Sequence, residues 1–229
     1  MNTLALVILD VDGTLIDSND AHARAWMDAF AEYGFRVEFS KVRPLIGMGG
    51  DNLMPLAIGI QSSSDLGEKI EERRGEIFKQ KYLPALKPFP KVRELLVHMR
   101  DEGLELVVAS SSSKEGLKNL LVKSDIADLI EEKTSGDDAA NSKPDPDIVK
   151  AALQKSGYVA EQAVMLGDTP YDIAASALCK VPCVALRCGG WPDQDLSGAS
   201  EIYDDPQDLL NKYHQSIFSR GRKKINLCV

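Results

Sequence analysis

The sequence predicts an α/β fold: a Rossmann-like three-layer sandwich with a parallel sheet, plus an inserted all-helical cap domain. Three observations support it. An unbroken apolar run occupies 4–9, strand-like and helix-like segments alternate after residue 88, and a mostly helical stretch separates the two. We therefore expect a core domain made of 1–16 and 88–229, with the cap at 17–87.

The apolar run at 4–9 is rich in β-branched side chains, as expected for a strand of a parallel sheet that is covered on both faces. It ends at Asp10, and ligands of such sheets bind outside the carboxyl ends of the strands. Asp12 adds a second carboxylate, and Gly13 allows a sharp turn. A strand that ends in an ordinary Asp/Gly turn is the alternative, but D-x-D-G-T is more specific than a turn.

The segment 17–87 reads as helical. Residues 17–20 can each cap a helix, and aromatic side chains then recur at helical spacing up to Gly34, a plausible C-terminal stop. Further helical stretches are expected near 40–46, 50–60 and 65–83. An insertion of this length is too long for a simple crossover between two parallel strands, which is why we interpret it as a cap.

From residue 88 the predicted elements alternate, which indicates βαβ units and helices on both faces of the sheet. Helices are expected at 90–101, 114–122, 146–156 and 171–178. Strands are expected at 104–109, near 129–130, at 163–166 and at 181–186, with a polar loop at 134–143.

Composition narrows the function classes. The net charge of −8 argues against a nucleic-acid backbone as the main partner, because such binding needs clustered Lys and Arg. The one basic cluster, at Arg220, Arg222, Lys223 and Lys224, reads as a solvated tail. The cysteines at 179, 183, 188 and 228 have neither zinc-ribbon spacing nor the density of a disulfide scaffold. The apolar run is too short for a signal peptide or membrane span, so a cytoplasmic protein without membrane contact is expected.

Polar residues follow the predicted core strands. The first ends at Asp10, the second at Ser110 and Ser111, and the strand at 163–166 is followed by Asp168. Lys143 lies in the loop before the helix at 146–156. Acids, hydroxyls and an ammonium at one sheet edge suit an anion together with a hard divalent cation, and Mg²⁺ is often held by one or two carboxylates plus phosphate.

These motifs resemble the haloacid dehalogenase superfamily, in its helical-cap branch of phosphatases, which includes phosphoglycolate phosphatases and β-phosphoglucomutase-like proteins. The resemblance rests on D-V-D-G-T at 10–14, V-V-A-S at 107–110, S-K-P-D-P at 142–146 and G-D-T-P-Y-D at 167–172. Each motif alone is weak. All four in this order, at strand ends or in loops before helices, make the resemblance strong.

The resemblance implies a role for each motif residue. Asp10 would be the nucleophile that forms an aspartyl-phosphate, and Asp12 the general acid and base. Mg²⁺ would be held by Asp10, by the main-chain carbonyl of Asp12 and by Asp168. Ser110, Ser111 and Lys143 would bind phosphoryl oxygens. Asp172 would orient Lys143 or a metal-bound water, and an acid placed at a helix N-terminus for its dipole is the alternative reading.

The cap contributes candidates of its own. His22 lies in a D-S-x-x-x-H pattern that resembles one in sugar-phosphate members of the superfamily, and a helix-surface histidine is an equal alternative. Arg43, Gly47, Gly50 and Asp51 fall where relatives carry a loop that inspects the substrate, and a plain turn between helices remains open. The glycines are not followed by Lys-Ser, so they do not form a nucleotide P-loop.

The favoured function is magnesium-dependent hydrolysis of a small-molecule phosphomonoester. A dehalogenase would not need Asp12, because a halide leaves without a proton. A β-phosphoglucomutase-like mutase is the first alternative, but Gly167-Asp168 and Gly49-Gly50-Asp51 differ from the acid-acid pair and cap-loop arginine of such enzymes. A non-enzymatic binding protein, the second alternative, would be expected to lack Asp10 or Asp12. Neither the substrate nor the oligomeric state follows from the sequence.

Overall fold

The computed structural model describes residues 3–130 and 132–220. Its centre is a six-stranded parallel sheet with strand order β3-β2-β1-β4-β5-β6. The strands are β1 (Leu6–Leu9), β2 (Glu105–Ala109), β3 (Glu132–Thr134), β4 (Ala163–Gly167), β5 (Cys183–Leu186) and β6 (Glu201–Tyr203). The predicted α/β fold with a parallel sheet is confirmed.

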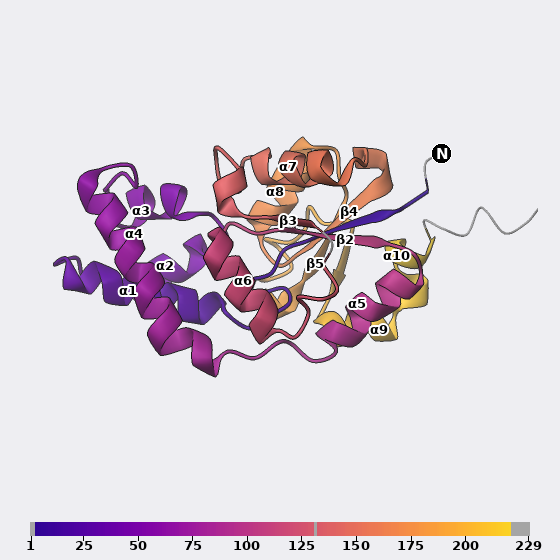
Figure 1. The fold of residues 1–229 in the computed structure, drawn as a ribbon, viewed down its shortest axis with the longest axis horizontal. Helices are drawn as coiled ribbons and strands as arrows, with labels where there is room; N and C mark the ends of the chain where they lie inside the picture. The colour runs from indigo at the N-terminus through magenta and orange to yellow at the C-terminus, as the bar shows by residue number, and fades with distance from the viewer. Residues whose placement is uncertain (1–2, 131, 221–229) are drawn as a thin grey trace, which may run out of the picture.

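Helices cover both faces of the sheet and complete three layers (Figure 1). One face carries α7 (Asp147–Ser156) and α8 (Pro170–Leu178). The other carries α5 (Val92–Asp101), α6 (Lys114–Lys123) and α9 (Pro206–Asn211), with α10 (Ile217–Arg220) beside them. An apolar cluster lies between the sheet and each layer of helices, and alternate residues of β1 belong to different clusters. Leu6 and Ile8 pack towards α7 and α8, whereas Val7 and Leu9 pack towards the layer with α5, α6 and α9. This two-sided burial explains the unbroken apolar run.

The strand order brings the polar strand ends together. β1 lies between β2 and β4, and Leu9 is in register with Val108 and Leu166. The strands that follow β1 along the chain, β2 and β3, lie on one side of it, and β4, β5 and β6 lie on the other. The connections on the two sides diverge at β1, and this divergence opens a crevice at the carboxyl ends of β1 and β4. Asp10 and Asp168 each follow a strand at this crevice.

The segment between β1 and α5 is helical and lies at one end of the molecule, away from the sheet (Figure 1). It contains α1 (Asn19–Glu32), α2 (Phe39–Val42), η1 (Arg43–Leu45), α3 (Gly50–Ile58), α4 (Asp65–Ile77), η2 (Phe78–Tyr82) and η3 (Leu83–Ala85). Trp26, Phe30, Met54 and Ile70 are buried within it. These helices agree with the helix expected between the capping residues 17–20 and Gly34, and with the stretches expected near 40–46, 50–60 and 65–83.

Two stretches of chain join this helical segment to the core side by side. Ile16 and Pro88 form an antiparallel bridge, the Asp17 amide donates to the Lys87 carbonyl at 3.1 Å, and the Phe89 amide donates to the Leu15 carbonyl at 3.1 Å. The crossing falls at the division expected between 17–87 and the rest. Treating these parts as two domains stays a prediction, and any hinge between them would act on this pair of segments.

One predicted strand is wrong. The strand expected near 129–130 lies at Glu132–Thr134, where it pairs with Val107–Ala109. Leu129 and Ile130 are buried in the preceding turn, in the apolar cluster under α6, so their hydrophobicity reflects packing and not sheet pairing. The sequence reading also missed β6, α9 and α10, which are three to six residues long.

Two further expectations concern composition. Cys179, Cys183 and Cys188 are free thiols, and Cys228 lies outside the described residues. Of the basic cluster, Arg220 pairs with Glu201, while 222–224 also lie outside the described residues. No helix in the described part of the chain is both long enough and apolar enough to cross a lipid bilayer.

Candidate active site

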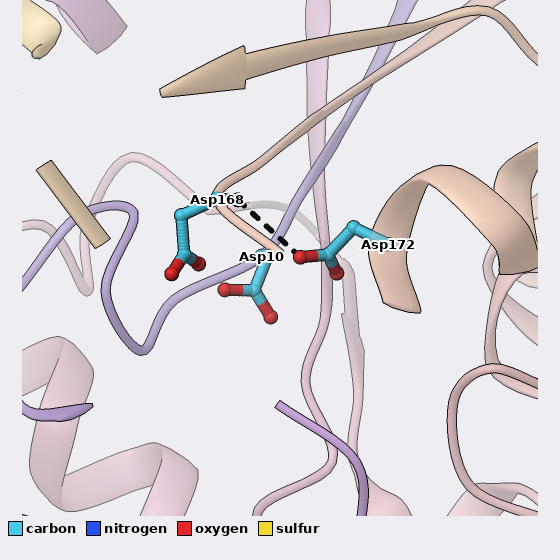
Figure 2. Close-up of side chains that lie close together, drawn as sticks. All are labelled: Asp10, Asp168 and Asp172. Atoms are coloured by element: carbon cyan, nitrogen blue, oxygen red, sulfur yellow. Dashed lines mark hydrogen bonds between the residues drawn. The ribbon is translucent and has the colours of Figure 1, made fainter. Parts of the chain in front are cut away.

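Three buried carboxylates meet at the crevice (Figure 2). Asp10 follows β1, Asp168 follows β4, and Asp172 lies in the first turn of α8. One oxygen from each lies within 4.8 Å of the others. Three acids from separate elements reach one point because their strands are neighbours and α8 starts directly after β4.

Lys143 places one positive charge among these acids. Its Nζ lies 2.6 Å from Asp10 Oδ1 and 2.7 Å from Asp172 Oδ1, and the residue is 1% exposed. Burial alone would lower the pKa of Lys143, but the two carboxylates outweigh burial and raise it. The side chain is therefore a permanent cation against the oxygen that would act as nucleophile.

Asp172 both caps the start of α8 and pairs with Lys143. Its Oδ2 accepts hydrogen bonds from the Thr169 amide at 3.0 Å and hydroxyl at 2.7 Å, closing a capping box at the start of α8. Its Oδ1 holds Lys143. The two readings of Asp172 left open by the sequence, helix-end acid and partner of Lys143, therefore both describe its contacts.

Asp10 and Asp168 are linked by side chains that the sequence reading did not single out as functional. The Thr14 hydroxyl lies 3.0 Å from Asp10 Oδ2 and 2.9 Å from Asp168 Oδ1. Asn19 Nδ2 donates to Asp168 Oδ2 at 2.8 Å. Gly13 adopts φ +78°, and a side chain there would collide with Asn19 and Asp168, so the predicted need for glycine at the turn is confirmed.

The acids suit a divalent cation. The pKa of Asp10 is raised to about 7, because burial, helped by the nearby Asp172 charge, outweighs the opposing charge of Lys143. Burial and the charges of Asp10 and Asp172 also raise the pKa of Asp168 well above its usual range. Three buried carboxylates around one ammonium leave excess negative charge, which a divalent cation would balance with oxygen ligands. The donor set therefore fits the metal site that the motifs predicted.

Asp12 lies beside this cluster with its own set of donors. Ser18 Oγ is 2.5 Å and His22 Nε2 2.8 Å from Asp12 Oδ1, and Ser112 Oγ donates to Oδ2 at 3.0 Å. Burial would raise the pKa of Asp12, but His22 and these hydrogen bonds outweigh it and hold the pKa at about 2. In this arrangement Asp12 is an ionised, oriented carboxylate.

His22 is buried, not a surface residue of α1. Besides its contact with Asp12, its ring stacks on Phe78 with centroids 4.0 Å apart. Phe78 comes from the far end of the helical segment, so one cap side chain fixes the ring that faces a core acid. The sequence alternative of an exposed histidine does not fit this position.

The serines that follow β2 help to line the cavity that contains Asp10 and Asp12. Ser110 is 1% exposed, and its Oγ accepts a hydrogen bond from the Ser112 amide at 3.1 Å. Ser111 Oγ is buried and has no hydrogen-bond partner among the described residues. Ser111 lines a cavity of about 50 Å³ together with Asp10 and Asp12. An unpaired hydroxyl in that cavity is a ready donor to an anion.

The loop before α3 closes this cavity from the cap side. Gly47 and Gly50 line it, but Arg43 and Asp51 do not. Arg43 Nε pairs with Asp20 at 2.7 Å, and its guanidinium also donates to the Gly189 carbonyl. The structure thus brings only part of the expected cap group to the cavity.

Asp51 contacts the core loop that carries Lys143. Its Oδ2 accepts from the Ser142 amide at 3.1 Å, and the neighbouring Asn52 Nδ2 lies 3.4 Å from the Lys143 carbonyl. A Cβ at Gly49 would collide with the Ser142 side chain, so the two loops are in close contact. The cap loop is therefore fastened to the segment that positions the buried lysine.

Five side chains around the site were missed as functional candidates: Thr14, Ser18, Asn19, Arg74 and Ser112. Thr14 stands in the first motif, and Ser18 and Asn19 stand in the run of helix-capping residues that follows it. Ser112 belongs to the serine run at 110–113. Arg74 has no local signal, because it is one of many charged residues of α4.

Comparison with known proteins agrees with this geometry. The family described as haloacid dehalogenase-like hydrolase matches residues 7–186. A curated phosphoglycolate phosphatase of Rhodospirillum rubrum is 29% identical over 208 residues, covering 87% of this chain and 86% of its own. A crystal structure of a hydrolase from Pseudomonas syringae is 27% identical, with a TM-score of 0.85 over 92% of this chain and 98% of that one.

A more distant structure supports the fold alone. CbbY from Rhodobacter sphaeroides, in complex with phosphate, is 22% identical, with a TM-score of 0.77 over 90% of this chain and 96% of its own. The match spans nearly all of β1, the strands β2 to β5, the helical insertion and all four motifs of this chain, and β6 lies beyond its end. The chain therefore belongs to the haloacid dehalogenase-like hydrolases.

Proposed function

We propose that the protein is a magnesium-dependent phosphatase that hydrolyses a small-molecule phosphomonoester through an aspartyl-phosphate on Asp10. The observation that carries this proposal is the setting of Asp12. Asp12 shares a cavity with Asp10 and is oriented by Ser18, His22 and Ser112. Release of an alcohol needs a proton donor, whereas release of a halide does not, so the setting favours phosphoester chemistry over dehalogenation.

The first step forms a bond between an Asp10 carboxylate oxygen and phosphorus and breaks the bond from phosphorus to the ester oxygen. The departing oxygen takes a proton from Asp12, which must therefore be protonated when substrate is bound. An incoming phosphate dianion favours this, because it raises the pKa of a neighbouring carboxylate. Lys143, 2.6 Å from Asp10, offsets the negative charge shared by nucleophile and phosphoryl group.

The second step returns Asp10 and Asp12 to the states that they had before the first step, with Asp12 protonated. Water attacks phosphorus and gives its proton to Asp12, the bond from Asp10 to phosphorus breaks, and inorganic phosphate leaves. Ser110 and Ser111 would donate to phosphoryl oxygens, and the unpaired Ser111 hydroxyl supports this. Mg²⁺, held by Asp10, the Asp12 carbonyl and Asp168, would neutralise phosphoryl charge. Asp172 would keep Lys143 in place.

The substrate is proposed to be small. The Asp10 cavity adjoins a larger one of about 460 Å³ that the cap helps to line, which leaves room for a compact alcohol but not for a macromolecule. The curated relatives include phosphoglycolate phosphatases, so phosphoglycolate is the first substrate to test. Hexose phosphates and nucleoside monophosphates complete the panel.

Hydrolysis in ¹⁸O-water tests the proposal. With Mg²⁺ and the preferred phosphomonoester, we expect one ¹⁸O in each inorganic phosphate released, and no release by Asp10→Asn. The mutase alternative predicts instead isomerisation of a sugar phosphate that depends on a bisphosphate activator, with little free phosphate. A binding protein would release none from any substrate. Either of the last two results would overturn the proposal.

A further inference from the structure

Arg74 of α4 is a cation of the helical segment whose one ion-pair partner among the described residues, Glu71, is too far away for a hydrogen bond. Its side chain is 19% exposed, and its guanidinium carbon lies 4.9 Å from the centre of the Trp26 ring. The nearest carboxylate, on Glu71, is 3.9 Å away, beyond hydrogen-bond distance, and Arg74 Nε has no partner among the described residues. Burying a guanidinium without hydrogen bonds to an anion costs free energy, and a bound anion would remove this cost.

The position of Arg74 links two cavities. Arg74, His22, Ser111 and Ser112 line both the small cavity at Asp10 and the larger one of about 460 Å³. A phosphoryl group at Asp10 would therefore place its ester oxygen and leaving group towards Arg74. The larger cavity also contains Lys79, but Lys79 pairs with Glu115 at 2.6 Å. Of the described residues that line these cavities, Arg74 is the one cation outside hydrogen-bond distance of a carboxylate.

Building on the proposed function, we infer that Arg74 binds an anionic group on the leaving-group side of the substrate. The shared chemistry is a planar or tetrahedral oxyanion, supplied either by a carboxylate or by a second phosphate. A guanidinium matches such oxyanions with two parallel hydrogen bonds, and the cation–π contact with Trp26 restrains the Arg74 side chain. The loop at 47–51 contains no cation, and Arg43 is engaged by Asp20, so neither supplies this charge.

Glu71 sets the strength of this anion site. Its carboxylate is the closest negative charge to Arg74, and a Cβ at Gly50 would lie 2.6 Å from Glu71 Oε1. The absence of a side chain at Gly50 leaves room for Glu71 beside the cavity. An anionic leaving group would compete with Glu71 for Arg74, so removing the Glu71 charge should tighten anion binding while removing the Arg74 charge should weaken it.

Two matched substrate pairs separate the sources of the anion. Phosphoglycolate and hydroxyethyl phosphate differ by a carboxylate, and glucose 1,6-bisphosphate and glucose 1-phosphate differ by a phosphate. For the pair whose anion the site accepts, Arg74→Gln should lower kcat/KM of the anionic member on the order of 10- to 100-fold, the effect of a lost hydrogen bond to a charged group. For the member that lacks the second anionic group, kcat/KM should change less than about threefold. Glu71→Gln should raise kcat/KM of the anionic member only.

Binding measurements keep the inference testable apart from turnover. In Asp10→Asn, calorimetry should give at least about tenfold tighter binding of the member with the second anionic group, and the added Arg74→Gln should remove that preference.

If Arg74→Gln lowers kcat/KM equally for both members of both pairs, the inference is overturned and the phosphatase proposal stays intact. If wild type hydrolyses no substrate, the phosphatase proposal fails and the calorimetry alone decides the anion site. Should Arg74→Gln not fold, Glu71→Gln decides it, since no gain for either anionic member contradicts it.

Discussion

Replacing Lys143 by Met removes an ammonium that is buried among three acids and keeps a side chain of similar length. Lys143 is 1% exposed and lies 2.6 Å from Asp10 and 2.7 Å from Asp172. The substitution leaves both carboxylates buried without their counter-charge. We therefore expect a large loss of stability in metal-free buffer at pH 8, where these acids are most ionised.

The structure sets the size of this loss. At an effective dielectric constant of about 20, each contact corresponds to roughly 6 kcal/mol of gross attraction. Desolvation of the ammonium offsets much of that sum, and breaking a buried pair by removing one partner typically costs about 3–5 kcal/mol. We expect that loss for Lys143→Met. Mg²⁺ should stabilise the variant more than it stabilises the wild type, because the cation supplies positive charge to the same acids.

Urea unfolding followed by circular dichroism, with EDTA and with Mg²⁺, measures both effects. Lys91→Met is the matched control: Lys91 pairs with Glu94 at the surface, so the unfolding midpoint should stay unchanged. The double variant Lys143→Met/Asp172→Asn should recover part of the loss, since one unpaired charge leaves with the cation. A loss below about 1 kcal/mol for Lys143→Met, within the range of exposed ion pairs, would refute the reasoning.

Three further predictions follow from the same site. The pKa of Asp10 is raised to about 7 in the folded protein, so the folded state binds this proton more tightly than the unfolded chain does. The contribution of Asp10 to metal-free stability therefore falls as pH rises from about 4 through 7. The stability of Asp10→Asn relative to wild type should therefore increase by about 2–3 kcal/mol from pH 5 to pH 8 in urea titrations, and a flat difference would contradict the raised pKa. Asp51→Asn weakens the hydrogen bond that the Ser142 amide donates to Asp51 at 3.1 Å, so KM should rise about tenfold. The Mg²⁺ concentration for half-maximal activity should stay constant. An unchanged KM would show that this contact does not hold the cap. Exhaustive EDTA treatment should abolish activity, and Mg²⁺ or Mn²⁺ should restore it better than Zn²⁺; activity that survives EDTA would rule out the metal site.

The core of the site could be predicted because its residues stand at the ends of strands. Asp10 follows an apolar strand, and Asp168 follows another, so both acids carry a local signal of their position. The parallel sheet then brings them together whatever the loops do. Asp172 could be predicted too, but its two contacts, with Thr169 and with Lys143, could not be ranked without coordinates.

The rest of the site depends on contacts between the cap and the core, which no local pattern encodes. Arg74 is one charged residue of a charged helix, and only its packing on Trp26 distinguishes it from its neighbours. Asp51 was a candidate for a cap loop that inspects the substrate, and its contact with the Ser142 amide could not be foreseen from the sequence. The same limit explains β3: Thr134 is fully buried, but its strand is short and polar, so the apolar residues before it gave the stronger signal.

The central claim is covalent catalysis by Asp10, and a burst experiment on Asp12→Asn tests it most directly. With 4-nitrophenyl phosphate the leaving group needs no proton, so Asp10 can still be phosphorylated, while the attack of water stalls without its base. We predict a burst of about one nitrophenolate per protein molecule, followed by slow turnover. Mass spectrometry of the acid-quenched protein should place the phosphate on Asp10. A phosphate on another residue, or steady turnover at the wild-type rate with no burst, would contradict the mechanism.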